Sequence, residues 1–216
     1  MMTDALDYTG LTRMLLGAVE QIRENHKRLS ELDSYGGDGD HGTTMLRAME
    51  NLRKALEASK SDRMDVLLGE IAWAVMGTDG GATGPLFGSF FMGMSEGTAG
   101  KGSLDAAALA GVFEAGLASL CRQTRAQVGD KTVVDALVPA VRAAREAADK
   151  GSGLVAVLET AAEAAATGAS GTRDLQPRLG RAKNARQQSV GHEDPGAVSV
   201  SLIFKGFVEG VQSDGG

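Results

Sequence analysis

The hydrophobic positions of this 216-residue chain recur mostly at intervals of three and four, which is the spacing of amphipathic helices. The first such stretch covers about residues 8–32 and the second covers 43–58. Ser61 can cap a third helix, whose apolar stripe ends at Val75. Pro85 opens a fourth helix, since proline is favoured in the first helical turn.

Four more helices are predicted in the C-terminal half. The fifth helix starts at Ser103. Thr132 caps the sixth helix, and Asp135 is placed three residues on, where its side chain can bond back to the cap. An alanine-rich helix follows Gly153, and a short extra helix separates it from the last one, which begins at Asp194-Pro195. We find no convincing strand. The pattern therefore predicts an all-α bundle of eight helices in a single domain, residues 1–216.

The connections between these helices differ in composition. Short connections make successive helices antiparallel, so alternate connections share one end of a bundle. Almost all of the Gly, Asp, His and Arg chemistry falls in the connections after the first, third, fifth and seventh helices, residues 33–42, 77–84, 124–131 and 180–193. The same end collects four helix N-termini, each with free N–H groups and a positive dipole end. We therefore expect the functional site at this end.

The first of these connections carries three aspartates, Asp33, Asp38 and Asp40, among glycines. Carboxylates this close repel one another unless a cation lies between them, and oxygen ligands favour Mg²⁺ or Ca²⁺ over zinc. An EF-hand is excluded because the twelfth loop position would be Thr44 or Met49 instead of glutamate. A dinucleotide fingerprint is excluded because the glycine pattern at 37–42 follows a helix. The alternative to a metal site is a solvated Gly/Asp turn between two helices.

The glycine-rich connection at residues 80–85 has the composition of a backbone cradle for phosphate oxygens, although no Walker A motif is present. Phosphates bind readily at helix N-termini. Together with the aspartate loop, this connection indicates a site for a metal-bound polyphosphate.

The composition limits which binding partners and which cellular compartment we expect for this protein. The formal charge is −6 and no basic tract occurs, which argues against nucleic acid and anionic membranes as partners. The single cysteine, Cys121, excludes an internal disulfide and fits a reducing compartment. No signal peptide and no apolar run long enough to span a bilayer is visible. We expect a cytoplasmic protein.

Four motifs occur in order along the chain, at residues 32–42, 80–88, 129–132 and 191–196. Together they resemble the nucleotide-binding (L) subunits of dihydroxyacetone kinases, the DhaL or DAK2-domain family, over nearly the whole chain. The resemblance implies a barrel-like bundle of eight antiparallel helices. It also implies a kinase subunit that uses ATP or ADP with Mg²⁺ and phosphorylates a short-chain ketose held by a separate substrate-binding (K-type) subunit. A phosphohistidine donor of the phosphotransferase system is a further partner that the resemblance leaves open.

The resemblance also implies roles for single residues. Asp33, Asp38 and Asp40 match the aspartates that hold two Mg²⁺ ions, and with Arg181 they are the implied catalytic residues. The implied nucleotide contacts are His41, Gly42, Thr43, Thr44, Ala82, Thr83, Thr124, Val133, Arg181, Asp194, Pro195 and Gly196. Simpler roles stay open: Asp194 also suits a helix cap, Val133 a core position and Arg181 a surface ion pair.

The chain departs from the family pattern between residues 183 and 189. The usual second arginine falls on Gln188, with Arg186 close by, and Thr124 stands where glycine is expected. Two alternatives therefore stay open beside a dihydroxyacetone kinase: a subunit of a kinase for a four-carbon ketose such as erythrulose, and a non-catalytic nucleotide-binding regulator. A third alternative is a purely structural helix bundle in which the aspartate loop is only a solvated turn.

Overall fold

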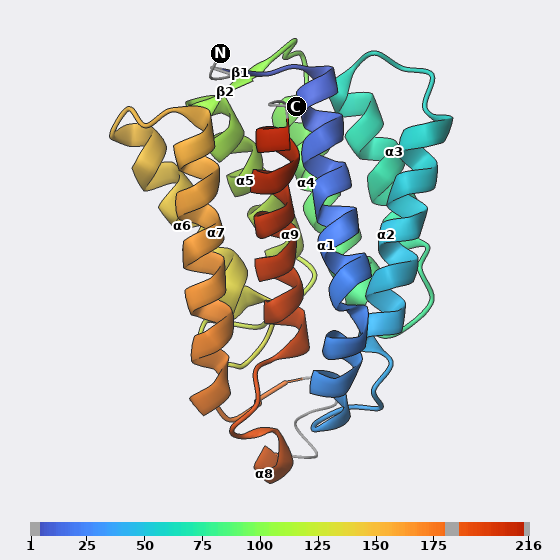
Figure 1. The fold of residues 1–216 in the computed structure, drawn as a ribbon, viewed down its shortest axis with the longest axis vertical. Coiled ribbons are helices and arrows are strands. Elements are labelled where there is room, and N and C mark those ends of the chain that lie inside the picture. Colours follow the sequence, from blue (N-terminus) through green and yellow to red (C-terminus); the bar gives the residue numbers. More distant parts are fainter. Residues whose placement is uncertain (1–4, 180–185, 214–216) are drawn as a thin grey trace.

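The structure, a computed structural model, describes residues 5–179 and 186–213, and helices make up most of this part of the chain (Figure 1). None of the described helices combines the length and the apolar character that crossing a membrane requires. The elements in chain order are β1 (Ala5–Leu6), α1 (Tyr8–Ser34), α2 (His41–Ala58), α3 (Met64–Met76), α4 (Thr83–Thr98), β2 (Leu104–Asp105), α5 (Ala106–Cys121), α6 (Val134–Asp149), α7 (Leu154–Gly171), the 3-10 turn η1 (Thr172–Asp174), α8 (Arg186–Ser189) and α9 (Pro195–Gln212).

The eight long helices form a closed ring. Each helix from α1 to α6 contacts the next one along the chain, and α9 packs between α7 and α1. Neighbours run antiparallel, so the ends of α1, α3, α5 and α7 meet the starts of α2, α4, α6 and α9 at the lower end in Figure 1. The predicted barrel-like bundle of eight antiparallel helices is confirmed.

Apolar faces of the helices fill the interior of the ring. Three fully buried phenylalanines from α5 and α9 meet there, with centroid distances of 5.1 Å for Phe113–Phe204 and 5.4 Å for Phe204–Phe207. Tilted aromatic pairs at this separation are favourable beyond the area they bury. The interior is therefore a packed core beneath the loops that carry the candidate site.

The contact between α1 and α9 depends on glycine. A Cβ atom at Gly17 would overlap the carbonyl oxygen of Gly206, and a Cβ at Gly206 would overlap that of Gly17. One turn further along α9, a Cβ at Gly210 would overlap the carbonyl oxygen of Arg13. Because no side chains separate the two backbones, α9 lies directly on α1. This contact closes the ring and fixes the start of α9 beside the end of α1.

Several predicted helix starts are wrong by a few residues. Helix α2 begins at His41 and α4 at Thr83, so Pro85 is the third residue of its helix. The predicted cap at Ser61 and the predicted helix start at Ser103 are wrong. Helix α3 follows Arg63, and α5 is capped by Asp105, whose carboxylate accepts the N–H of Ala108 at 2.8 Å. Local sequence leaves such ends open because neighbouring polar residues can each serve as a cap.

The prediction of no strand is wrong for two residue pairs. Ala5 pairs with Asp105 and Leu6 with Leu104 in an antiparallel arrangement, at the upper end of the ring in Figure 1. A strand of two residues has no periodicity that a sequence pattern can show. Its partner also lies far away in the chain, so only the closed fold brings the two together.

We expect the substitution Gly206→Ala to lower the free energy of unfolding by about 1–3 kcal/mol, because the added methyl group overlaps the backbone of α1. Chemical denaturation monitored by circular dichroism measures this. The matched control is Gly171→Ala at the exposed end of α7, where an added Cβ meets nothing within 4 Å. That variant should be neutral or slightly stabilised. Equal stability of the two variants would contradict the role of the glycine contact.

Candidate functional site

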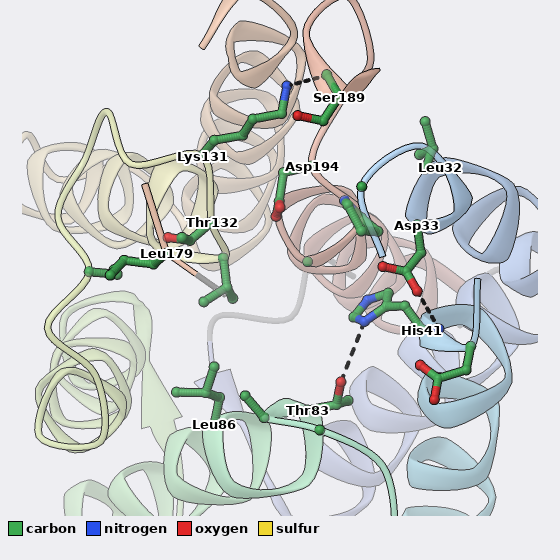
Figure 2. Close-up of a pocket in the computed structure, with 18 of the residues that line it drawn as sticks. Leu32, Asp33, His41, Thr83, Leu86, Lys131, Thr132, Leu179, Ser189 and Asp194 are labelled. Atoms are coloured by element: carbon green, nitrogen blue, oxygen red, sulfur yellow. Dashed lines mark hydrogen bonds between the residues drawn. The ribbon is translucent and has the colours of Figure 1, made fainter. Parts of the chain in front are cut away.

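A cavity of about 320 Å³ opens where the four unusual connections meet. This volume falls within the range of roughly 300–1,000 Å³ that is typical of small-molecule sites. Figure 2 shows residues from the ends of several helices pointing into it. The predicted site residues that line it are Asp33, Asp38, Asp40, His41, Ala82, Thr83, Thr124, Val133, Asp194, Pro195 and Gly196.

The other predicted site residues are placed differently. Gly42 packs against α1, where a Cβ would overlap the carbonyl oxygen of His26. Thr43 is exposed and Thr44 is buried, and neither lines the cavity. Arg181 lies outside the described residues.

The three aspartates converge at one side of the cavity. Asp33 belongs to the last turn of α1, Asp38 to the following loop, and Asp40 directly precedes α2. One carboxylate oxygen of each lies within 4.8 Å of the others. The loop wraps tightly around Asp33, whose carbonyl oxygen accepts the N–H of Gly37 at 2.6 Å. Hard cations such as Mg²⁺ take oxygen ligands of this kind.

His41 begins α2 and connects three helices. Its Nε2 lies 2.9 Å from the hydroxyl of Ser199 on α9. Its Nδ1 lies 3.4 Å from the hydroxyl of Thr83 on α4 (Figure 2). The Ser199 hydroxyl donates to the carbonyl oxygen of Pro195, so this network assigns the proton of the ring to Nε2. Burial lowers the pKa of His41 to about 4, although the Asp33 carboxylate opposes this shift. The imidazole is therefore neutral at pH 7.

The glycine-rich loop before α4 forms another wall. Gly80 and Gly81 have positive φ angles of 126° and 54°, conformations that L side chains rarely adopt. Behind the loop, the Thr44 hydroxyl is buried with no hydrogen-bond partner among the described residues, and a Cβ at Gly80 would lie 2.6 Å from it. No described side chain caps α4, so the N–H groups of its first turn stay available to an anion.

The opposite half of the cavity is apolar. Leu86, Phe87, Val133 and Leu179 line it, and Figure 2 shows Leu86 and Leu179 across the cavity from Asp33. The Thr124 hydroxyl accepts the N–H of Ala126 at 3.1 Å, so this side chain also shapes its own loop. The cavity thus suits an elongated ligand with an anionic end and a flat apolar end.

Asp135 and Asp194 shape the backbone of this half. Asp135 accepts the N–H groups of Gly129 at 2.6 Å and Thr132 at 2.7 Å, which confirms its expected reach back to Thr132. Helix α6 itself starts only at Val134. Asp194 caps α9 by accepting the N–H of Ala197 at 2.8 Å. Burial raises the pKa of Asp194 to about 7, against the opposing effects of the bonded N–H groups and Lys131.

Two features of the site were missed by sequence reasoning. Lys131 is 4% exposed and donates hydrogen bonds to three backbone carbonyl oxygens. The rings of Tyr35 and His192 stack with centroids 3.5 Å apart and an interplanar angle of 7°. The motif at residues 129–132 contains Lys131, but no local pattern signals its partners, which lie far along the chain.

Comparisons with known proteins agree with this geometry. A family model described as the DAK2 domain matches residues 36–209. The ADP-binding subunit DhaL of PEP-dependent dihydroxyacetone kinase 1 from Listeria innocua is 35% identical, over 88% of this chain and 90% of that protein. The ADP-binding subunit DhaL of PEP-dependent dihydroxyacetone kinase from Escherichia coli is 33% identical, over 93% of this chain and 96% of that protein.

A solved structure shares the fold. The dihydroxyacetone kinase from C. freundii in complex with AMP-PNP and Mg²⁺ superposes with a TM-score of 0.70 at 25% identity, over 92% of this chain. This chain spans 33% of the length of that kinase. The chain therefore belongs to the DAK2 domain family, in which it is similar to the ADP-binding DhaL subunits of dihydroxyacetone kinases.

Proposed function

We propose that this chain is the nucleotide-binding subunit of a dihydroxyacetone kinase, which binds ADP or ATP with Mg²⁺ and transfers a phosphoryl group to a short-chain ketose on another subunit. The observation that carries the proposal is the convergence of Asp33, Asp38 and Asp40 within 4.8 Å, beside the starts of α2 and α4. The similarity to two ADP-binding subunits over nearly their whole length supports it.

The residues present fit such a ligand. Asp33, Asp38 and Asp40 would hold Mg²⁺, in our proposal two ions. The glycine backbone at 80–81 and the start of α4, which no described side chain caps, suit the phosphate end of such a ligand, since N–H groups there stay available to an anion. The metal, when bound, supplies charge neutralisation for the phosphates.

The remaining work of the chain is positioning and electrostatic stabilisation, as expected for phosphoryl transfer. Backbone N–H groups at the starts of α2 and α4 would bind phosphate oxygens. The apolar half, with Leu86, Val133 and Leu179, would hold the base. His41, neutral at pH 7, would hold α2, α4 and α9 in register without adding charge. Arg181, outside the described residues, remains a proposed contact to the transferred group.

The acceptor would come from a second subunit. Each histidine of the chain is engaged in its own fold: His26 bonds the carbonyl oxygen of Arg23, His41 lies between Ser199 and Thr83, and His192 stacks on Tyr35. None of them is placed to hold a ketose. A K-type substrate subunit is therefore the proposed partner, and a phosphohistidine donor of the phosphotransferase system the proposed source of phosphate for bound ADP.

We expect the double substitution Asp38→Asn and Asp40→Asn to abolish Mg²⁺-dependent ADP binding, measured by isothermal titration calorimetry. Without metal, the variant should be as stable as the parent or more stable, because it relieves carboxylate repulsion. The control is Asp62→Asn, an exposed aspartate at the opposite end of the ring. Unchanged ADP–Mg²⁺ binding by the double variant would refute the metal assignment.

We expect ADP and Mg²⁺ together to raise the melting temperature far more than either alone, because phosphates and carboxylates would share the same ions. At a ligand concentration of 100 Kd the stabilisation is about 2.7 kcal/mol. For a chain of this size that corresponds to a shift of roughly 5–10 °C, which differential scanning calorimetry resolves. Equal shifts with and without Mg²⁺ would contradict shared ions.

We expect the purified chain, given ATP, Mg²⁺ and dihydroxyacetone or erythrulose, to form no sugar phosphate until a K-type subunit is added. Coupled detection of ADP release and mass spectrometry of the sugar phosphate measure this. Turnover by the isolated chain would contradict the division of labour. The chain could also bind ADP–Mg²⁺ tightly and yet form no sugar phosphate with a K-type subunit, whether ATP or a phosphohistidine donor supplies the phosphate. That result would favour the non-catalytic regulatory alternative.

A further inference from the structure

Lys131 lies in the wall of the cavity, yet its charge is directed away from any ligand (Figure 2). Its ammonium group donates to the carbonyl oxygens of Thr172 at 2.8 Å, Ser189 at 2.8 Å and His192 at 2.7 Å. A lysine ammonium has three protons, so all of its donors are used. The side chain therefore acts on the backbone around the cavity and not on a phosphate group.

The three carbonyl oxygens belong to separate parts of the chain: η1, the end of α8 and the loop before α9. Two further hydrogen bonds hold the same parts together, from Gly191 N–H to the carbonyl oxygen of Arg173 at 2.9 Å and from Asp194 N–H to the hydroxyl of Thr172 at 2.8 Å. Hydrogen bonds from a charged donor are stronger than those from a neutral donor, so the three Lys131 bonds are stronger than these two. Lys131 thus anchors one edge of residues 189–194.

The other edge of residues 189–194 is attached to α1 and the aspartate loop. The ring of His192 stacks on Tyr35, which follows Asp33 by two residues, and Glu193 pairs with Arg28 of α1 at 2.8 Å. Ser189, His192, Glu193 and Asp194 all line the cavity. The segment therefore reaches from the start of α6 to the metal-binding side of the cavity.

The backbone at Lys131 supports a specific requirement for this side chain. Its φ angle is +62°, and among the described residues it is the one non-glycine residue with a positive φ. A non-glycine residue in this region carries a conformational cost and persists where the surroundings hold it. Glycine would avoid this cost, so the contacts of the lysine side chain must offset it.

We propose that Lys131 is a positioning residue that holds residues 189–194 across the cavity and thereby slows the release of bound nucleotide. This inference rests on the proposed function, because it requires a nucleotide in the cavity. Without the ammonium group, three carbonyl oxygens lose their charged donor. The segment then keeps the two weaker hydrogen bonds to Arg173 and Thr172 and its attachment through Tyr35 and Glu193. The segment then moves aside more readily, so dissociation accelerates while association changes little.

The test measures the dissociation rate constant of a fluorescent ADP analogue, N-methylanthraniloyl-ADP with Mg²⁺, displaced by excess ADP in a stopped-flow instrument. We expect Lys131→Met to raise this rate constant about tenfold or more, which corresponds to about 1.4 kcal/mol or more. Lys131→Gln, which keeps two N–H donors, should fall between this variant and the parent. A general loss of structure would reduce the fraction that binds and leave the rate of release from the bound fraction unchanged.

The matched control is Lys101→Met, since Lys101 also donates to a backbone carbonyl oxygen, that of Gly97 at 2.8 Å, at the opposite end of the ring. It should leave release unchanged. A folded Lys131→Met protein whose release rate lies within twofold of the parent overturns the proposal. If that variant does not fold, Tyr35→Ala decides instead: several-fold faster release supports the positioning of the segment, and an unchanged rate overturns it. Failure of the parent itself to bind the analogue would refute the proposed function, which is a distinct result.

Discussion

The close contact between α1 and α9 is the constraint on which the rest of the structure depends. These helices lie at opposite ends of the sequence, and their backbones approach each other because Gly17, Gly206 and Gly210 carry no side chain. The contact closes the ring of eight helices. It also sets the end of α1, with Asp33, beside the start of α9, with Asp194. Without this closure, the aspartate loop and the segment before α9 would not share a cavity.

Within the closed ring, the two sides of the cavity show opposite electrostatics. On one side, one carboxylate oxygen from each of three aspartates lies within 4.8 Å of the others, an arrangement that could hold a cation. On the other side, the buried ammonium of Lys131 is satisfied by backbone carbonyl oxygens, near the half-buried carboxyl group of Asp194. The first arrangement concentrates negative charge, while the second stabilises the backbone around the site. The same end of the fold thus combines a cluster of negative charge with a positive charge whose three donors are all bonded to backbone carbonyl oxygens.

Much of the fold could be predicted from local patterns. Helical spacing of apolar residues identified the eight long helices, and the alternation of plain and unusual connections placed the chemistry at one end. The Asp135 and Asp194 contacts followed from cap rules. Exact helix starts could not be predicted as well. A start was predicted at Ser103, for example, but the carboxylate of Asp105, two residues later, caps the helix. The β1–β2 pair gave no signal, because it depends on two segments that only the closed ring brings together.

For the candidate site, the sequence by itself determined which residue types are available: three aspartates in a glycine-rich loop, a glycine-rich turn and the motifs of the DAK2 domain family. These are local features, since each is contained in a few consecutive residues. Tertiary structure alone decided that Lys131 binds the carbonyl oxygens of Thr172, Ser189 and His192, that Tyr35 stacks on His192, and that His41 connects three helices. Each of these contacts joins segments that are distant in the chain. The partners of Lys131 are backbone carbonyl oxygens, a group that every residue has. Their use as partners is therefore set by the path of the folded chain and not by residue identity.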